Sequence, residues 1–155
     1  KNLQPTYIKM ATRALASGII QKPVEDVWAA LRDFTFPAKL IGVVESCVME
    51  EDASPTSVGA VRRIKWTSGE ERRQRLIEVS DQFRSITWEL VETINHVAEA
   101  SAQITNVKLH RITEDNSTLI VWSSDFAADV EPSLITFEQA SYLTTIKEIR
   151  TALTQ

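Results

Sequence analysis

Six basic residues fall in two short alternating segments near the middle of the chain. They are Arg62, Arg63, Lys65, Arg72, Arg73 and Arg75. Such a cluster could bind phosphates, hold an anionic ligand or stabilise charge that develops in a reaction. Alternation along a strand spreads these side chains over two faces, and Glu70, Glu71 and Glu78 are interleaved with them. A net charge of −4 and a pI near 5.3 also oppose binding to a phosphate backbone, so we expect no nucleic-acid partner.

Arg62 is the basic residue that we expect inside the fold. Alternation places Arg62, Ile64 and Trp66 on one face of their strand, with the intervening residues on the other. A charge that is removed from water needs a partner. Glu45 is the candidate within the protein, and an anionic group on a ligand is the alternative. A brace between strands through a carboxylate and a contact with ligand both remain open.

The other reactive side chains, Cys47, His96 and His110, form no recognisable catalytic or metal-binding set. A single cysteine cannot form an intrachain disulfide or a cysteine-rich metal site. Neither histidine can be placed beside Cys47, so a cysteine nucleophile would lack its base. The four scattered glycines make no phosphate-binding loop. We therefore expect no catalytic residue, metal or cofactor.

The elements that position these residues follow a simple order. Strands are expected at 11–21, 43–49, 59–66, 71–79, 84–93, 98–112 and 118–127, and helices at 24–34, 38–41 and 132–155. Alternation of apolar and polar residues indicates the strands, and a period of about 3.6 indicates the helices. This order predicts an α+β fold, in which helices cover one face or end of an antiparallel sheet.

The segment 132–155 is the longest amphipathic helix in the chain. Its apolar stripe comprises Ile135, Tyr142, Ile146, Ile149 and Leu153. At ~1.5 Å per residue this helix would be roughly 30 Å long, enough to cross a small domain. One long helix would then cover one large sheet, and the space between them would hold either a solid core or a ligand.

The face of the sheet toward this helix is predicted to be mainly apolar and aromatic. Ile86, Trp88 and Leu90 share one face of their strand, and we place Gln74 and Leu76 on the same side. A wall of Trp, Ile and Leu with few polar groups is typical of a pocket for a small ligand.

Four motifs resemble the polyketide cyclase/dehydrase and lipid-transport branch (SRPBCC) of the START-like, pollen-allergen-like helix-grip superfamily. They occupy residues 20–34, 58–62, 75–78 and 122–126, and residues 142–149 resemble the grip helix of the family. The resemblance covers nearly the whole chain. It implies a helix-grip fold, in which a curved antiparallel sheet of about seven strands wraps around the long C-terminal helix, with two short helices after the first strand. Family members bind lipids, sterols, plant hormones or polyketides in the cavity, and a minority catalyse reactions there.

The same resemblance argues against two known activities. In related hormone receptors and lachrymatory-factor-forming enzymes, the arginine matched by Arg62 works with a glutamate on the following strand. Gln74 stands at that place, and a neutral amide cannot act as a carboxylate general acid or base. The receptor lysine that pairs with a hormone's carboxylate is matched by Glu45. The resemblance therefore implies a binding protein more than an enzyme or a hormone receptor.

The predicted organisation is a tail or tag at residues 1–9 and a single helix-grip domain at 10–155. No apolar run reaches the ~20 residues of a membrane-spanning helix, so we expect a soluble protein without stable membrane insertion. The single cysteine favours the reducing cytoplasm. The oligomeric state stays open.

The predicted function is binding or transport of a small hydrophobic or amphipathic ligand, such as a lipid, sterol or polyketide-like molecule. The alternative is a cyclase or dehydratase acting in the same cavity, in which Arg62 stabilises negative charge and Gln74, Glu45 or Asp125 positions the substrate. An interaction domain that uses apolar residues around 36–41 is a third class. The residues predicted to bind ligand are Glu45, Arg62, Ile64, Trp66, Gln74, Leu76, Trp88, Leu90, Ser123, Tyr142 and Ile146.

Overall fold

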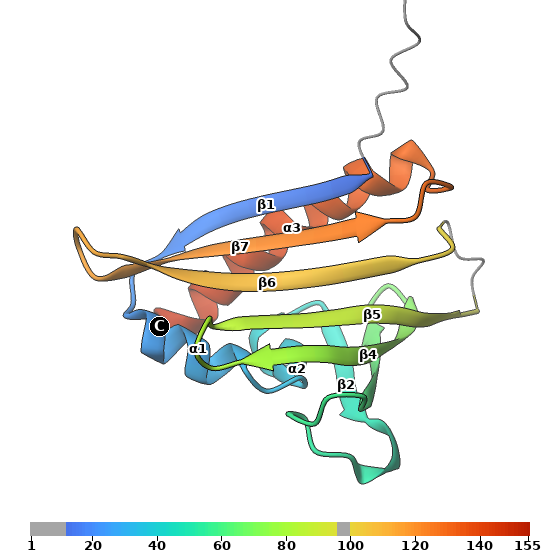
Figure 1. The fold of residues 1–155 in the computed structure, drawn as a ribbon, viewed down its shortest axis with the longest axis horizontal. Helices are drawn as coiled ribbons and strands as arrows, with labels where there is room; N and C mark the ends of the chain where they lie inside the picture. The colour runs from blue at the N-terminus through green and yellow to red at the C-terminus, as the bar shows by residue number, and fades with distance from the viewer. Residues whose placement is uncertain (1–11, 96–99) are drawn as a thin grey trace, which may run out of the picture.

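The computed structural model describes residues 12–95 and 100–155, which form an antiparallel sheet, a long helix and two short helices (Figure 1). The elements in chain order are β1 (Arg13–Ile20), α1 (Val24–Leu31), α2 (Phe36–Leu40), β2 (Val44–Met49), the 3-10 turn η1 (Glu50–Asp52), β3 (Val61–Trp66), β4 (Glu71–Ser80), β5 (Ser85–Ile94), β6 (Gln103–Ile112), β7 (Ser117–Phe126) and α3 (Pro132–Leu153). The predicted α+β class and order of elements are confirmed. The predicted tail, residues 1–9, lies outside the described residues.

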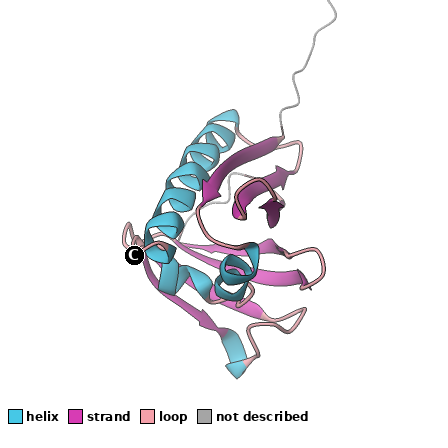
Figure 2. Ribbon diagram, turned by 90° about the vertical axis from the view of Figure 1, so that its left-hand side faces the viewer, coloured by secondary structure: helices cyan, strands magenta, loops and turns pink. Residues whose placement is uncertain are grey.

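The sheet has seven strands in the order β1-β7-β6-β5-β4-β3-β2. Every neighbouring pair is antiparallel, and each strand from β2 to β7 lies beside its neighbour in sequence. The strand β1 instead pairs with β7, so α1 and α2 carry the chain from one edge of the sheet to the other. The sheet curves, and α3 runs along its open side (Figure 2).

The two short helices differ in extent from the prediction. The first helix ends at Leu31 and not at Phe34, because the Asp33 carboxylate accepts hydrogen bonds from the backbone N–H and the hydroxyl of Thr35. The second helix begins at Phe36, two residues before its expected start at residue 38. Proline lacks only an N–H that is unpaired in the first turn of a helix, so Pro37 suits this position.

The start of β6 is also a correction. The alternation of residues predicts a strand from residue 98, whereas β6 begins at Gln103. Of the expected residues, 98 and 99 lie outside the described part of the chain, and 100–102 are not in a strand.

The long helix α3 packs closely on β1 and covers its free edge. A side chain at Gly18 would meet the Cγ2 atom of Ile146 at 2.8 Å, so only glycine permits this approach. Gln139 accepts a hydrogen bond from the backbone N–H of Leu15 (3.2 Å), and Arg150 donates one to the carbonyl of Ile19 (2.9 Å). These contacts use backbone groups that an edge strand would otherwise leave unpaired.

The apolar stripe of α3 faces the sheet as predicted, with one polar member. Tyr142, Ile146 and Ile149 are buried, while Ile135 and Leu153 are partly buried. Glu138 lies on the same stripe, four residues before Tyr142, and is only 4% exposed. The helix therefore carries a carboxylate into the interior.

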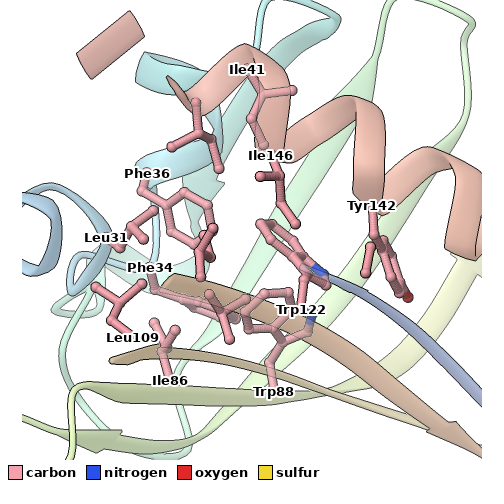
Figure 3. Packing of buried hydrophobic residues seen from close by; sticks show 14 of the residues in the cluster. Leu31, Phe34, Phe36, Ile41, Ile86, Trp88, Leu109, Trp122, Tyr142 and Ile146 are labelled. Carbon is pink, nitrogen blue, oxygen red and sulfur yellow. The ribbon is translucent and has the colours of Figure 1, made fainter. Parts of the chain in front are cut away.

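A solid aromatic and aliphatic cluster fills the interior beneath α1 and α2 (Figure 3). Phe34 and Phe36 pack against Trp88 with ring centroids 5.9 and 6.2 Å apart, and Trp88 meets Trp122 edge to face at 5.7 Å. Figure 3 shows Tyr142 beyond Trp122, at the border of this cluster. A cavity begins at that border, where Trp122 and Tyr142 line it.

Among the described residues, no helix combines the length and the apolar composition that crossing a membrane requires.

Candidate functional site

A cavity of about 280 Å³ lies between the sheet and α3. Its wall includes Trp66, Trp88 and Trp122 from β3, β5 and β7, and Tyr142 from α3. A second pocket of about 550 Å³ adjoins it, because both spaces are lined by Ser68, Glu70, Arg72, Gln103 and Phe137. Phe137 is 60% exposed, so this outer pocket leads from the cavity to the surface. The two spaces together reach the size range of ~300–1,000 Å³ that is usual for small-ligand pockets.

The structure brings most of the predicted ligand-binding residues to this space. Arg62, Ile64, Trp66, Gln74, Trp88 and Tyr142 line the inner cavity, and Leu90 lines the outer pocket. Leu76 and Ile146 face the interior but are fully enclosed, so they belong to the packed core beside the cavity.

Glu45 is not part of the cavity, which corrects the prediction. The strand β2 has an irregularity between Val44 and Ser46 in its pairing with β3. Val44 and Cys47 are therefore the inward residues, and Glu45 is exposed, with a carboxylate oxygen 3.5 Å from the Nζ atom of Lys65. Simple alternation could not show this local change of direction.

Ser123 was also assigned to the wrong face. Its hydroxyl accepts a hydrogen bond from Arg13 at 3.3 Å on the convex side of the sheet. Its neighbours Trp122 and Ser124 point toward α3, where Ser124 contacts Tyr142. A shift of one residue along a strand exchanges the two faces, so the prediction missed Ser124 by one position.

Arg62 is the central polar residue of the inner cavity and is only 2% exposed. Its Nε donates to the side-chain oxygen of Gln74 (2.8 Å), and its Nη1 donates to the backbone carbonyl of Phe34 (2.7 Å). The guanidinium lies 4.0 Å from the ring centroid of Phe34 and 4.6 Å from that of Trp88. Cation–π contacts and neutral acceptors hold this charge, and no carboxylate among the described residues pairs with it. Of the two alternatives left open for Arg62, the brace through a carboxylate is therefore not found among the described residues.

Burial has a measurable consequence for Arg62. Removal from water lowers the pKa of its guanidinium to about 10, because the charged form loses hydration. This value still leaves the side chain charged at neutral pH. The cavity wall therefore carries a positive charge that the described residues do not neutralise.

Trp122 adds an unused donor to the same wall. Its indole Nε1 is buried and has no hydrogen-bond partner among the described residues. Buried donors are nearly always paired in folded proteins, so this group calls for an explanation. In the sequence, Trp122 is an apolar residue at an inward strand position. That pattern does not distinguish it from an ordinary core residue.

A hydroxyl network forms the wall between β6, β7 and α3. The hydroxyls of Thr105 and Ser124 lie 2.6 Å apart, and those of Ser124 and Tyr142 lie 2.5 Å apart. Gln103 donates to the Tyr142 hydroxyl at 3.1 Å. Burial, followed by the nearby Glu138 carboxylate, raises the pKa of Tyr142 above its ordinary value, so its phenol stays protonated.

Arg72 and two glutamates separate the inner cavity from the outer pocket. Nη2 of Arg72 lies 2.9 Å from Glu138 on α3, and Nε lies 2.8 Å from Glu70 in the β3–β4 turn. These contacts tie the hairpin to the long helix. This cluster was not predicted from the sequence, although Arg72 lies two residues before Gln74 in the alternation of β4 and Glu138 occupies the apolar stripe of α3. Two charged residues of opposite sign, Arg72 and Glu138, at positions that face the interior could have indicated a buried ion pair.

Cys47 lies near the filled end of the interior. Its thiol donates weakly to the carbonyl of Phe34 (3.8 Å), and burial raises the pKa of the thiol. This environment favours an inert side chain over a nucleophile. The described residues contain no group of three or more His, Cys, Asp or Glu side chains that could hold a metal ion.

Comparison with known families adds one match that covers most of the chain. Residues 13–150 match the family described as polyketide cyclase / dehydrase and lipid transport. No curated protein matches the sequence significantly.

Solved structures agree with the fold. A protein from Nitrosospira multiformis has a TM-score of 0.80 and 23% identity, over 92% of this chain and 97% of that chain. The ginseng major latex-like protein 151 from Panax ginseng has a TM-score of 0.72 and 17% identity, over 92% and 97% of the two chains. Ara h 8.0201 has a TM-score of 0.73 and 12% identity, over 91% and 96%. At these identities the likeness shows a shared fold, and the predicted helix-grip architecture is confirmed.

Proposed function

We propose that this chain, which belongs to the polyketide cyclase/dehydrase and lipid transport family, binds a small hydrophobic or amphipathic ligand between its sheet and α3. The observation that carries the proposal is the cavity of about 280 Å³, which three tryptophans line and which adjoins an outer pocket of about 550 Å³. Transfer of apolar surface from water to such a wall is favourable by ~25 cal/mol per Å². A lipid, sterol or polyketide-like molecule would supply that surface.

A binding or carrier role fits the polar groups of the wall. Glu70 and Glu138 are the carboxylates that line the inner cavity among the described residues, and both accept hydrogen bonds from Arg72. Both carboxylates are therefore engaged in ion pairs of the cavity wall, which fits a structural role for them in a binding protein. Cys47 is a buried free thiol, which suits a carrier in the reducing cytoplasm.

A cyclase or dehydratase is the second candidate, favoured by the unneutralised charge of Arg62 beside the cavity. That charge could stabilise an enolate as it forms. The positioning residues first considered do not support this role, since Glu45 pairs with Lys65 and Asp125 is exposed and pairs with Arg13. If the wild-type protein converts a bound ligand to a product and the Arg62→Met variant does not, an enzymatic function would be favoured over binding alone.

Native mass spectrometry of the purified protein tests the binding proposal. We expect a small molecule at one equivalent that is lost on denaturation, or one equivalent of an added naphthylamine probe. Thr145 lines the inner cavity from α3, whereas its neighbour Thr144 is exposed outside it. Thr145→Phe should therefore abolish binding, and the matched control Thr144→Phe should retain it. A wild-type protein that binds neither, or a Thr145→Phe variant that binds normally, would overturn the proposal.

A further inference from the structure

The inner end of the cavity presents hydrogen-bond donors whose acceptors are missing. A guanidinium has five N–H donors. Arg62 directs one to Gln74 and one to the carbonyl of Phe34, and its other N–H groups have no acceptor within residues 12–95 and 100–155. The side-chain oxygen of Gln74 is already used in this contact.

Trp122 extends this donor surface. Its buried Nε1–H lacks an acceptor in the described part of the chain, and its side chain is 5% exposed. Trp88 connects the two donors, because its ring lies 4.6 Å from the Arg62 guanidinium and 5.7 Å from the Trp122 ring. The Arg62 guanidinium and the Trp122 ring, both of which line the cavity, are therefore parts of one aromatic wall.

The outer pocket has the opposite character. Leu90, Ile94, Leu134 and Phe137 line it with apolar surface. Its cation, Arg72, is already compensated by Glu70 and Glu138. A ligand would thus find unpaired positive charge at the inner end and apolar surface toward the mouth.

We propose that the ligand is an amphipathic carboxylate, which binds with its carboxylate against Arg62 and Trp122 and its apolar chain toward Phe137. This inference rests on the proposed binding function and adds the chemistry and direction of the ligand. A carboxylate accepts several hydrogen bonds at once and neutralises a guanidinium that is otherwise buried with its charge unpaired. Entry in the reverse direction would leave both donors unpaired and place the anion beside two glutamates.

Probes with one chain and different heads isolate the head-group preference. Decanoate, decanol and decylamine are titrated at neutral pH, with shorter and longer homologues to allow for cavity length, and the affinities are measured by calorimetry. We expect decanoate to bind about tenfold more tightly than decanol, because a hydrogen bond to a charged group is stronger than one to a neutral group. Decylamine should bind least tightly.

Two substitutions test the two donors. Arg62→Met keeps an unbranched side chain but removes the charge, and should equalise the affinities of decanoate and decanol. Trp122→Phe keeps an aromatic ring and removes the N–H, and should weaken decanoate binding roughly threefold or more. Arg63→Met is the matched control, because Arg63 is exposed on the other face of β3 and pairs with Glu71. Thermal melting shows which variants fold. If Arg62→Met does not fold, the result for Trp122→Phe still tests the proposal.

The outcomes separate this inference from the binding proposal. Equal affinity of the wild-type protein for decanoate and decanol would overturn the carboxylate assignment and leave ligand binding standing. An unchanged preference for decanoate in folded Arg62→Met, or unchanged decanoate affinity in Trp122→Phe, would also overturn it. Failure of every homologue to bind the wild-type protein would remove the binding proposal and this inference together.

Discussion

The space between the sheet and α3 is solid at one end and open at the other. At the solid end, Leu31, Phe34 and Phe36 from the connection between β1 and β2 enter the interior and pack on the sheet. At the open end, α3 presents Glu138 and Ser141 to the cavity, and the short helices contribute only Pro37 of α2 among the described lining residues. The same sheet and helix therefore support stability at one end and leave room for a ligand at the other.

Two arginines of the cavity wall show the same contrast on a smaller scale. Arg62 and Arg72 lie on neighbouring strands and both line the inner cavity. Arg72 pairs with two glutamates, whereas Arg62 contacts an amide, a carbonyl and aromatic rings. We infer that Arg72 has a structural role, because it links the β3–β4 hairpin to α3, whereas Arg62 remains available to a ligand.

Truncation of one phenylalanine at each end should give the largest difference in stability. Phe34→Ala removes a fully buried ring from the solid end and should lower the free energy of unfolding by about 3–5 kcal/mol. Phe137→Ala removes a ring that is 60% exposed at the mouth and should change it by less than about 0.5 kcal/mol. Urea unfolding followed by circular dichroism measures both. Similar losses would contradict the distinction between the ends.

Removal of one partner from the buried ion pair should have the next largest effect. Glu138→Leu leaves Arg72 with Glu70 alone and should cost about 3 kcal/mol, because loss of the more deeply buried partner leaves the charge of Arg72 only partly compensated. The double variant Arg72→Met/Glu138→Leu should recover much of this loss, since an apolar replacement of both partners needs no desolvation of charge. A double variant as unstable as the sum of the single changes would show that the two residues do not act as a pair.

Gly18 tests the close contact of α3 with β1. Gly18→Ala would place a Cβ atom 2.8 Å from Ile146 and should cost about 2 kcal/mol, because the packed helix must shift. Gly42→Ala is the matched control, since a Cβ there meets nothing within 4 Å and should change the stability by less than about 1 kcal/mol. If Gly18→Ala and Gly42→Ala lowered the melting temperature equally, α3 would have to shift away from β1 without loss of stability, which would contradict close packing at Gly18.

The reactivity of a thiol should differ at the two ends. Burial raises the pKa of Cys47, so its alkylation should be slower than that of a free thiol at neutral pH and should accelerate as the pH rises. The raised pKa also means that the protonated thiol favours the folded state below the unfolded pKa of about 8.5, and that this contribution is lost as the pH rises from there through the raised pKa of the folded state.

A thiol at the open end provides the comparison. Ser141 is exposed and lines the cavity, so Ser141→Cys in a Cys47→Ala background should react rapidly and be protected by bound ligand. Rapid alkylation of Cys47 in the native protein, at a rate similar to that of the introduced cysteine, would contradict the solid end.

The sequence predicts the architecture well because its main signals are repeated along whole elements. Alternation over β3 to β5 places Arg62, Gln74 and Trp88 on the inner face, and the stripe of α3 identifies Tyr142. Single-residue events lie outside such patterns. The irregularity beside Glu45 turns that side chain outward, and an offset of one position exchanges Ser123 for Ser124.

Contacts between distant elements are the other part that the sequence does not reveal. The Arg72–Glu138 pair joins residues 66 positions apart, and the carbonyl of Phe34 reaches Arg62 from a loop. Patterning locates each partner on a face, but only the curvature of the sheet and the path of the connecting loops decide which partners meet.

The most direct test follows the four tryptophan indole N–H groups in a proton–nitrogen correlation NMR spectrum during titration with decanoate. Trp66, Trp88 and Trp122 line the cavity, whereas Trp28 donates to Asp81 at 2.8 Å away from it. If the ligand occupies the cavity, the Trp122 signal should move most, saturating at one equivalent, while the Trp28 signal stays in place. A bound state in which Trp122 is unchanged, or in which Trp28 moves equally, would contradict a ligand site between the sheet and α3.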